Sequence, residues 1–382
     1  MRRRLLLIRG GAMSKFSGLG KAFHDLKQVL QNDEVDGWTY AGTLEYESTS
    51  KMTAFQRLRK RWTIHPKTVK NSLKNSNDVD AALITDQEQA HLVPKQSSIP
   101  VGVYVHDFFH LFPTQENFPE GEVNIGQAKP GFVRKRDISK LKKGLERADF
   151  ILCNTEYTRQ LCSLYLPKKP LHVIAYHLNS KEYEFSETAN EYPKEFDATK
   201  CNLLVVGSHE PRKRLSFIVD VMKELDDHVK QDILVHHVGS NYCHERNHTI
   251  DHYASQAGVV WKHYGQGVDD AQLNRMRWNA ERLLFPSAAE GFGYPPLEAC
   301  LSGLPVLCSD QPAHNEFIPN EMCIDARDSS LWKEQITQIH WVWKQRNGPR
   351  QPFDFEAGTF QKFNKSHYCN TFSKVLNSVF EN

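Results

Sequence analysis

The chain has 382 residues, more than a single hydrophobic core usually supports, so its length predicts two domains. Hydrophobic residues make up 40% and charged residues 25%, as in an ordinary soluble globular protein, and the net charge of +2 singles out no class of partner. The eight cysteines form neither a C-x-x-C pair nor a Cys/His cluster. This spacing argues against a disulfide framework or a zinc site and favours a reduced, cytosolic compartment.

The N-terminal residues resemble a signal peptide only in carrying three arginines before an apolar run. That run, 5–8, is too short for the core of a signal peptide, and no small-residue cleavage site follows. We expect a buried first strand instead. No stretch approaches the roughly 18–20 apolar residues that cross a bilayer, so we expect a cytoplasmic protein whose membrane contact, if any, is peripheral.

Short apolar strands alternate with longer helical patterns along the whole chain, which predicts an α/β fold with parallel sheets covered by helices on both faces. The polar, acidic stretch 179–200 has poor periodicity and is typical of a linker. We therefore predict two doubly wound, Rossmann-like domains facing across a cleft, with ligands beyond the carboxyl ends of the strands. The expected strands are 5–8, 81–84, 101–105, 150–153, 171–174, 203–206, 233–238, 259–263, 283–285 and 305–307. The expected segments are an N-terminal domain 1–180, a linker 181–200, a C-terminal domain 201–358, and a helix 359–382 that packs back on the N-terminal domain.

Two features of the first domain follow strands. Gly18 and Gly20 open a helix after the first strand, which suits close approach to a phosphate or a sugar. A purely structural turn explains them equally well, and the full dinucleotide pattern G-x-G-x-x-G is missing. His106 and Asp107 end the strand 101–105, where a histidine could bond a sugar hydroxyl, although packing or capping is the commoner role of a lone histidine.

The basic segment 51–74 contains no acidic residue, and Phe55, Leu58 and Trp62 form an apolar stripe at helical spacing beside its cations. This pattern suits contact with an anionic membrane that carries a lipid-linked acceptor. It also suits an acidic acceptor such as nucleic acid. The third interpretation, a surface helix whose stripe packs on the N-terminal domain, stays open.

Two segments of the second domain carry the chemistry. After the strand 203–206 come Gly207 and then the cations Arg212, Lys213 and Arg214, which could neutralise a pyrophosphate leaving group or form a solvated basic turn. After the strand 283–285 come Glu290, two glycines, two prolines and Glu298. Prolines suit the first turn of a helix, and a helix N-terminus suits a phosphate, so the two carboxylates can grip hydroxyls on either side of a bound diphosphate.

Together these segments resemble the retaining glycosyltransferases of the GT-B fold, specifically glycosyltransferase family 4, and most closely its bacterial-type mannosyl- and glucosyltransferases. The E-x7-E signature of that family is matched by Glu290 and Glu298, and its H-D element by His106 and Asp107. Its G-I-G-R element is matched by 18–21 and its G-x-x-E-P-R-K-N element by 207–214, with Arg214 in place of the asparagine. The stretch 146–161 also resembles a family segment, and the block 290–310 is the most specific part.

The resemblance implies roles for these residues. Glu290 would contact the donor sugar near its anomeric centre, and Glu298 would hold the ribose hydroxyls. Arg212 and Lys213 would stabilise the departing diphosphate, and His106 would touch the donor sugar from the opposite domain. The other residues expected near the donor or its phosphates are Gly18, Gly20, Gly207, Phe292, Gly293, Tyr294 and Leu297, with backbone N–H groups of Phe292 and Gly293 as ligands.

The implied activity is hexosyl transfer, with retained anomeric configuration, from GDP-mannose or UDP-glucose to a glycan or lipid-linked acceptor. By resemblance we expect no cofactor and no metal, and the pair Asp78 and Asp80 suggests a solvated turn. Two departures matter: Ser208 and His209 stand where many members have an arginine, and 175–179 replaces the usual p-N-G-v-D segment. Alternatives are a GT-B-fold sugar-nucleotide epimerase or phosphorylase, a non-catalytic sugar-nucleotide-binding protein and a DNA-modifying glycosyltransferase.

Overall fold

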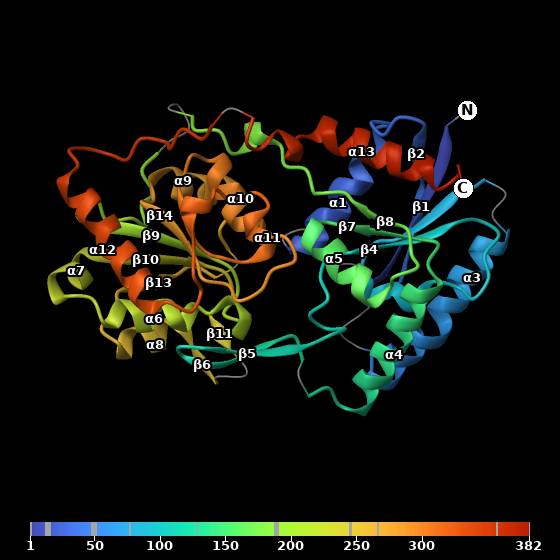
Figure 1. The fold of residues 1–382 in the computed structure, drawn as a ribbon, viewed down its shortest axis with the longest axis horizontal. Helices are drawn as coiled ribbons and strands as arrows, with labels where there is room; N and C mark the ends of the chain where they lie inside the picture. The colour runs from blue at the N-terminus through green and yellow to red at the C-terminus, as the bar shows by residue number, and fades with distance from the viewer. Residues whose placement is uncertain are drawn as a thin grey trace. The chain divides into compact units, whose positions relative to one another are not determined.

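The computed structural model describes residues 2–11, 17–46, 52–75, 78–127, 129–186, 191–243, 247–265, 267–356 and 358–381 (Figure 1). The chain forms two compact α/β units. Unit 1 comprises Met1–Phe112, Lys129–Leu178 and Gln361–Asn382, and unit 2 comprises Pro113–Ala128 and Asn179–Phe360.

Unit 1 is built on a six-stranded parallel sheet in the order β2-β1-β3-β4-β7-β8, with helices above and below it in Figure 1. Its apolar strands are buried on both faces, as a sheet covered by helices requires. The strands are β1 (Arg3–Gly11), β2 (Trp38–Tyr46), β3 (Ala81–Ile84), β4 (Val101–Val105), β7 (Phe150–Cys153) and β8 (Leu171–Val173). The helices are α1 (Gly18–Gln31), α2 (Ala54–Arg59), a π-helical turn (Lys60–Ile64), α3 (His65–Asn75), α4 (Phe132–Arg147), α5 (Glu156–Tyr165) and α13 (Lys365–Ser378), with a 3₁₀ turn at Gln87–Leu92.

The C-terminal helix α13 completes unit 1. Asn377 Oδ1 accepts hydrogen bonds from Arg3 Nη1 at 3.2 Å and Trp38 Nε1 at 3.0 Å. Phe372 and Leu376 are fully buried. The last segment of the chain therefore covers the start of the first two strands.

Unit 2 is built on a second six-stranded parallel sheet, in the order β13-β10-β9-β14-β15-β16. Its core includes the fully buried Trp332 and the strands around it. The strands are β9 (Cys201–Val206), β10 (Ile233–Val238), β13 (Trp261–His263), β14 (Arg282–Phe285), β15 (Val306–Ser309) and β16 (Cys323–Ile324). The main helices are α6 (Leu215–Lys223), α7 (Asp227–Asp232), α8 (Ile250–Gln256), α9 (Asp270–Asn279), α10 (Tyr294–Leu301), α11 (Pro312–Asn315) and α12 (Ser329–Gln345). Two hairpins add β5 (Thr114–Phe118) with β6 (Gly121–Ile125), and β11 (Tyr242–Cys243) with β12 (His248–Thr249).

The structure confirms the predicted fold class, and a strand occupies each of the ten predicted positions, with small shifts at the ends. The sequence patterns missed β2, because this edge strand is only partly buried and alternates polar with apolar residues. Residues 113–128 were predicted within the N-terminal domain, but they belong to unit 2. Residues 187–190 of the predicted linker, and Lys51 of the basic segment, lie outside the described residues.

Across the described ranges, no helix combines the length and hydropathy needed to span a bilayer. The same residues contain no group of three or more His, Cys, Asp and Glu side chains arranged to hold a metal ion.

Candidate active site

The loop between β14 and α10 is shaped by one glycine. Gly293 adopts φ +98° and caps α10, whose first turn contains Pro295 and Pro296. A side chain at position 293 would be strained at that φ, and its Cβ would lie 3.2 Å from His314 Cδ2. The expected order of strand, glycine-rich loop and helix is therefore present. The loop follows the carboxyl end of β14.

Glu290 lies in this loop and makes contact with both candidate cations. Lys213 Nζ donates to Glu290 Oε1 at 2.5 Å, and Arg212 Nη1 lies 3.0 Å from Glu290 Oε2. The carboxylate side chain is only 8% exposed. Three residues predicted to act on the donor thus form one largely buried cluster.

The chain topology explains why these side chains meet. β9 and β14 are parallel neighbours, so the segments that follow them share one edge of the sheet. After β9 the backbone turns at Gly207, which has φ +144°, and reaches the 3₁₀ turn Pro211–Lys213. A backbone hydrogen bond of 2.7 Å from Ala288 N–H to Arg212 C=O ties this turn to the loop of Glu290.

The charge state of the cluster follows from burial and pairing. Burial alone would raise the pKa of Glu290, but the charges of Lys213 and Arg212 outweigh it and lower the pKa to about 2. Burial lowers the pKa of Lys213, and the charge of Glu290 acts in the opposite direction. We therefore describe Glu290 as a carboxylate throughout the physiological pH range.

Glu298 is the fifth residue of α10 and has two polar partners. Arg277 Nη2 of α9 donates to Glu298 Oε2 at 2.5 Å, and the Tyr183 hydroxyl donates to Glu298 Oε1 at 3.2 Å. The sequence analysis missed both partners. Neither carries a motif, and Tyr183 falls in the segment interpreted as a linker.

The other residues predicted near the donor contribute differently. Leu297 is fully buried, and Phe292 is 4% exposed with its ring stacked on Phe317, so both side chains serve packing. Tyr294 is the first residue of α10 and packs edge-on against Phe292. Donor contacts by the backbone of Phe292 and Gly293 stay a prediction.

In unit 1, His106 is held by its neighbours at the end of β4. Its Nε2 lies 2.7 Å from the carbonyl oxygen of Thr85, which can only accept, so Nε2 donates and Nδ1 accepts from the Tyr176 hydroxyl. The ring is buried, and burial lowers its pKa to about 4. Both ring nitrogens serve internal contacts here, and the catalytic role of His106 stays a prediction.

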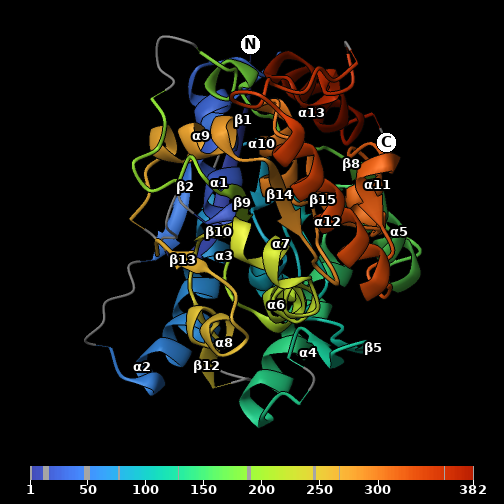
Figure 2. The same ribbon diagram turned by 90° about the vertical axis from the view of Figure 1, so that its left-hand side faces the viewer.

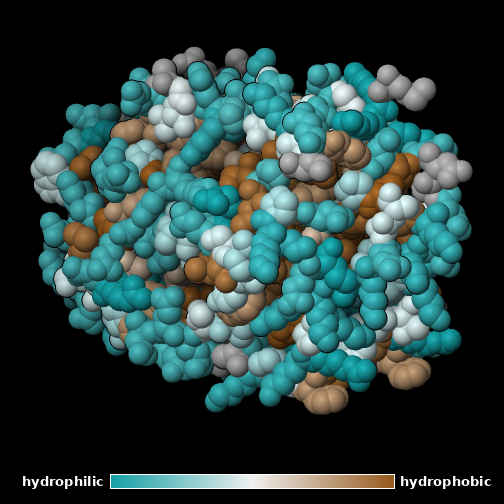
Figure 3. Space-filling view, turned by 45° about the vertical axis from the view of Figure 1, so that its right-hand side comes forward, coloured by the Kyte–Doolittle hydropathy of each residue, from teal (hydrophilic) through white to brown (hydrophobic). Residues whose placement is uncertain are grey.

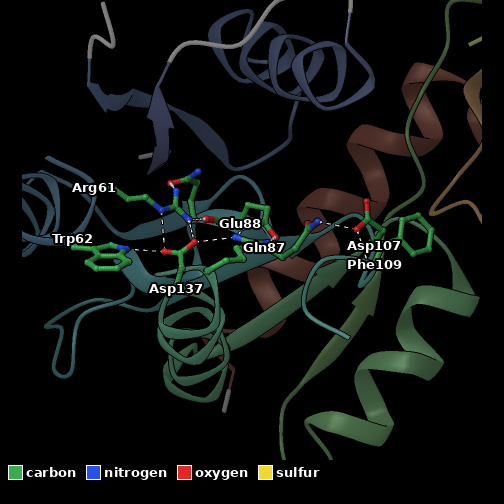
Figure 4. Close-up of polar contacts among 9 residues, drawn as sticks. Arg61, Trp62, Gln87, Glu88, Asp107, Phe109 and Asp137 are labelled. Carbon is green, nitrogen blue, oxygen red and sulfur yellow. Dashed lines mark hydrogen bonds and ion pairs between the residues drawn. The ribbon is translucent and has the colours of Figure 1, made fainter. Parts of the chain in front are cut away.

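Asp107 does not orient the His106 ring in this structure. Gln87 links the two residues instead. Its Oε1 accepts from the backbone N–H of His106 at 3.0 Å. Its Nε2 donates to Asp107 Oδ1 at 3.3 Å (Figure 4). The Asp107 carboxylate also accepts from the Phe109 N–H. Gly18 and Gly20 lie in the first turn of α1, where the Gly20 N–H donates to the Ser17 side chain at 3.1 Å.

Part of the basic segment packs on unit 1. Arg61 donates to both carboxylate oxygens of Asp137 on α4, and Trp62 Nε1 donates to Asp137 Oδ1 at 2.8 Å (Figure 4). Phe55, in the same predicted stripe, is 74% exposed. The segment therefore combines a packed end with an exposed end.

A buried carboxyl group of unit 1 has an unusual protonation state. Asp86, just after β3, is 5% exposed, and its Oδ1 has no hydrogen-bond partner. Burial and the nearby charge of Glu88 raise its pKa to about 7. The group is therefore protonated in the folded chain at pH values where the unfolded chain has already ionised it.

We expect Asp86→Asn to stabilise the protein at alkaline pH. Because the folded pKa lies above the unfolded value, the wild type loses stability as pH rises from about 4 to 7. At pH 8.5 the variant should exceed the wild type by about 2 kcal/mol in free energy of unfolding, and the difference should shrink toward pH 4. Urea unfolding at both pH values measures this. Asp78→Asn, at an exposed carboxylate, is the control, and a difference that is independent of pH would contradict the account.

A family match and the fold both bear on the class of this protein. Residues 187–347 match the family model described as glycosyl transferases group 1. The two Rossmann-like units give the chain the GT-B fold, and the family match supports a glycosyltransferase. The match covers Glu290, Glu298, Arg212 and Lys213.

The chain also resembles individual proteins, one by sequence and others by structure. The chain is 39% identical over 69 residues to the O-antigen chain mannosyltransferase RfbU of Salmonella typhimurium (strain LT2), an alignment that covers 18% of the chain and 20% of RfbU. It thus spans about a fifth of the length of that curated relative. A sucrose-phosphate synthase from Thermosynechococcus elongatus superimposes with a TM-score of 0.74 at 15% identity, covering 100% of both chains. Anabaena HepE in complex with UDP and glucose gives 0.69 at 13% identity, covering 99% of this chain and 100% of HepE.

Proposed function

We propose that this protein is a retaining glycosyltransferase of family 4 that moves a hexose from a nucleoside diphosphate sugar to an acceptor hydroxyl. The observation that carries the proposal is the cluster of Glu290, Lys213 and Arg212 at the carboxyl edge of the unit 2 sheet. Ligands of open α/β sheets bind at this edge. The match to the glycosyl transferases group 1 model over the same residues supports it.

The cluster suits a reaction in which negative charge gathers on a departing diphosphate. In the free enzyme the buried Glu290 carboxylate balances the positive charge of Lys213 and Arg212. When the donor binds, its phosphates take over Lys213 and Arg212, and the Glu290 carboxylate becomes available to the sugar hydroxyls. The cations are then fixed before the sugar–phosphate bond breaks, so they stabilise the charge that develops as it breaks.

Glu298 completes the proposed donor site from the ribose end. Its carboxylate has lone pairs for two ribose hydroxyls, and Arg277 and Tyr183 hold its orientation. The N-terminus of α10, which precedes Glu298 by one turn, adds partial positive charge for the phosphates. Glu290 and Glu298 thus frame the diphosphate from two sides.

The proposed donor is GDP-mannose or UDP-glucose, with no cofactor. RfbU is named as a mannosyltransferase, which supports mannose as the sugar, and the structural neighbour HepE was solved with UDP and glucose, which supports UDP-glucose. Thermal unfolding with UDP, GDP and ADP and their hexose conjugates decides between them. A bound ligand at 100 times its Kd should add about 2.7 kcal/mol of stability, and no stabilisation by any of these nucleotides would contradict the donor site.

Products then separate the enzyme classes. With a labelled donor, transfer to an added acceptor or slow release of free hexose supports a transferase, and NMR of the product reports whether the anomeric configuration is retained. An epimerised donor, or donor formed reversibly from phosphate, would favour the epimerase or phosphorylase alternatives. Tight nucleotide binding without donor consumption would favour a non-catalytic binding protein.

For the acceptor we propose a glycan or a lipid-linked glycan, reached at an anionic membrane surface. Within the segment 52–75, α2 continues through the π-helical turn into α3, and α2 forms the free end of this helix (Figure 2). This helix exposes two apolar side chains, Phe55 by 74% and Ile64 by 46%. The start of α4 exposes two more, Phe132 by 80% and Val133 by 47%. Exposed cations flank them: Arg57, Arg59, Lys67, Lys70, Lys74, Lys135, Arg136 and Lys143. Protruding phenylalanines beside cations suit an anionic lipid surface better than nucleic acid.

We expect the double variant Phe55→Ser with Phe132→Ser to bind membranes more weakly than the wild type. The wild type should sediment with vesicles of phosphatidylcholine and phosphatidylglycerol but not with phosphatidylcholine alone, and the variant should bind about fivefold more weakly. Phe353→Ser, at an exposed phenylalanine of unit 2, is the control. The face in Figure 3 is largely hydrophilic with separate apolar groups, so non-specific adhesion should be small. Salt-sensitive binding to DNA without vesicle binding would support the DNA-modifying alternative instead.

A further inference from the structure

The hairpin of β5 and β6 joins unit 2 although its sequence neighbours belong to unit 1. It lies between β4 and α4 in the chain, yet its strand β6 packs with the 3₁₀ turn Pro211–Lys213 of unit 2 (Figure 1). Phe118 and Glu120 are at its tip, and Gly121 closes it with φ +114°. From the sequence, this segment was predicted to belong to the N-terminal domain, with no functional role.

Glu120 forms a buried, bidentate ion pair with Arg214. Arg214 Nε donates to Glu120 Oε1 at 2.6 Å and Nη2 to Glu120 Oε2 at 2.9 Å. The Arg214 side chain is 0% exposed and the Glu120 side chain 4%. The guanidinium carbon of Arg214 lies 4.0 Å from the ring centre of Phe118 and 4.2 Å from that of Phe217. This geometry fixes the Arg214 side chain in one position.

Arg214 also connects three segments around the candidate site. Its Nη1 donates to the carbonyl oxygens of Ala326 at 2.7 Å and Pro286 at 3.3 Å, and Pro286 begins the loop that carries Glu290. Its backbone has φ +53°, a left-handed conformation that residues other than glycine rarely adopt. Arg214 directly follows Lys213, so this conformation sets the direction in which the preceding turn presents its cations.

We propose that Glu120 is a positioning residue for the glycosyl-transfer site: by holding Arg214, it fixes the turn that presents Arg212 and Lys213 to the diphosphate. This inference rests on the proposed function. Glu120 contacts no reacting atom, and its effect passes through Arg214 alone. The resembling family has asparagine where this chain has Arg214, so the hairpin pair is a feature of this chain.

The physical reason is the cost of a buried charge without a partner. If Glu120 loses its charge, the Arg214 guanidinium stays buried among aromatic rings and carbonyl groups, and the turn must move to rehydrate it. A displacement of about 1 Å in groups that stabilise a transition state can reduce the rate about a hundredfold. The loss should fall mainly on kcat, because the negative charge that these cations stabilise grows as the sugar–phosphate bond breaks.

Glu120→Gln tests the proposal in the full chain, with Glu116→Gln as a matched control. Glu116 lies on the same hairpin and pairs with Arg327, but that pair is exposed. We expect Glu120→Gln to lower kcat for donor consumption about 10- to 100-fold while the donor KM changes less than about threefold. Glu116→Gln should stay within about twofold of the wild type. A kcat within twofold for Glu120→Gln, or an equal loss in the control, would overturn the proposal.

The double variant Glu120→Leu with Arg214→Met separates positioning from stability. Replacing a buried ion pair by apolar side chains often restores stability. Restored thermal stability with kcat still reduced supports positioning, whereas recovery of both would show a merely structural role. If the wild type consumes no donor at all, the proposed function fails, and hydrogen exchange of the backbone amides of 212–215 still tests the ion pair. Faster exchange in Glu120→Gln than in Glu116→Gln supports a positioning role for Glu120, and equal exchange overturns it.

Discussion

Glu290→Gln is expected to lower kcat for donor consumption by about 10²- to 10³-fold, the range seen when one preorganised electrostatic group is removed from an active site. Glutamine keeps the size of the side chain but removes the charge that holds Lys213 and Arg212 in place. The two cations then repel each other without a buried counter-charge. The substitution also removes the strongest hydrogen-bond acceptor available to the hexose.

Glu281→Gln provides a control of matched chemistry. Glu281 accepts two hydrogen bonds from Arg346 at 2.5 and 2.7 Å and is 10% exposed, so it resembles Glu290 in burial and pairing. It precedes β14, whereas Glu290 follows that strand, so the two carboxylates lie at opposite ends of it. We expect its substitution to reduce stability but to leave kcat within about threefold of the wild type. Equal kcat values for the two variants would mean that the Glu290 loop is not the active site.

Lys213→Met is expected to reduce kcat by a similar factor, about 10²- to 10³-fold, for a different reason. Methionine occupies the space of the lysine stem but cannot stabilise the departing diphosphate. The buried Glu290 then keeps only Arg212 as a partner, so the affinity for a free nucleoside diphosphate should also fall about tenfold. Steady-state kinetics and calorimetric titration with the diphosphate measure the two effects.

The control for this variant is Lys344→Met, which breaks the exposed pair between Lys344 and Asp232 of unit 2. Exposed pairs contribute about 0–1 kcal/mol, so we expect little change in stability and none in kcat. If Lys213→Met keeps kcat within threefold of the wild type, the cation does not act on the leaving group.

Local sequence order accounts for the part of the site that was predicted. Strand, glycine-rich loop and helix recur along the chain, and parallel strands place the segments that follow them at one edge. This rule brings the turn after β9 to the loop after β14, and it therefore joins Lys213 and Arg212 to Glu290. The same alternation of strands and helices predicted the strands of both sheets except β2 and β16.

The partners that the sequence analysis missed are distant in the chain and carry no pattern of their own. Tyr183 reaches Glu298 across 115 positions, and Glu120 reaches Arg214 across 94. Such contacts depend on how a linker and a hairpin pack, which periodicity does not encode. His106 was predicted to bond a sugar hydroxyl, and in this structure Tyr176 and Thr85 contact its two ring nitrogens, so that role stays a prediction. The position of a residue at the end of a strand predicts which edge of the sheet it lies at, but it does not predict its hydrogen-bond partners.

A crystal structure of the complex with UDP-glucose or GDP-mannose, whichever stabilises the protein more, tests the donor site most directly. We predict the diphosphate against Lys213 and Arg212, the hexose hydroxyls within hydrogen-bond distance of Glu290, and the ribose hydroxyls within the same distance of Glu298. A nucleotide bound elsewhere, with Glu290 still paired to both cations, would contradict the account.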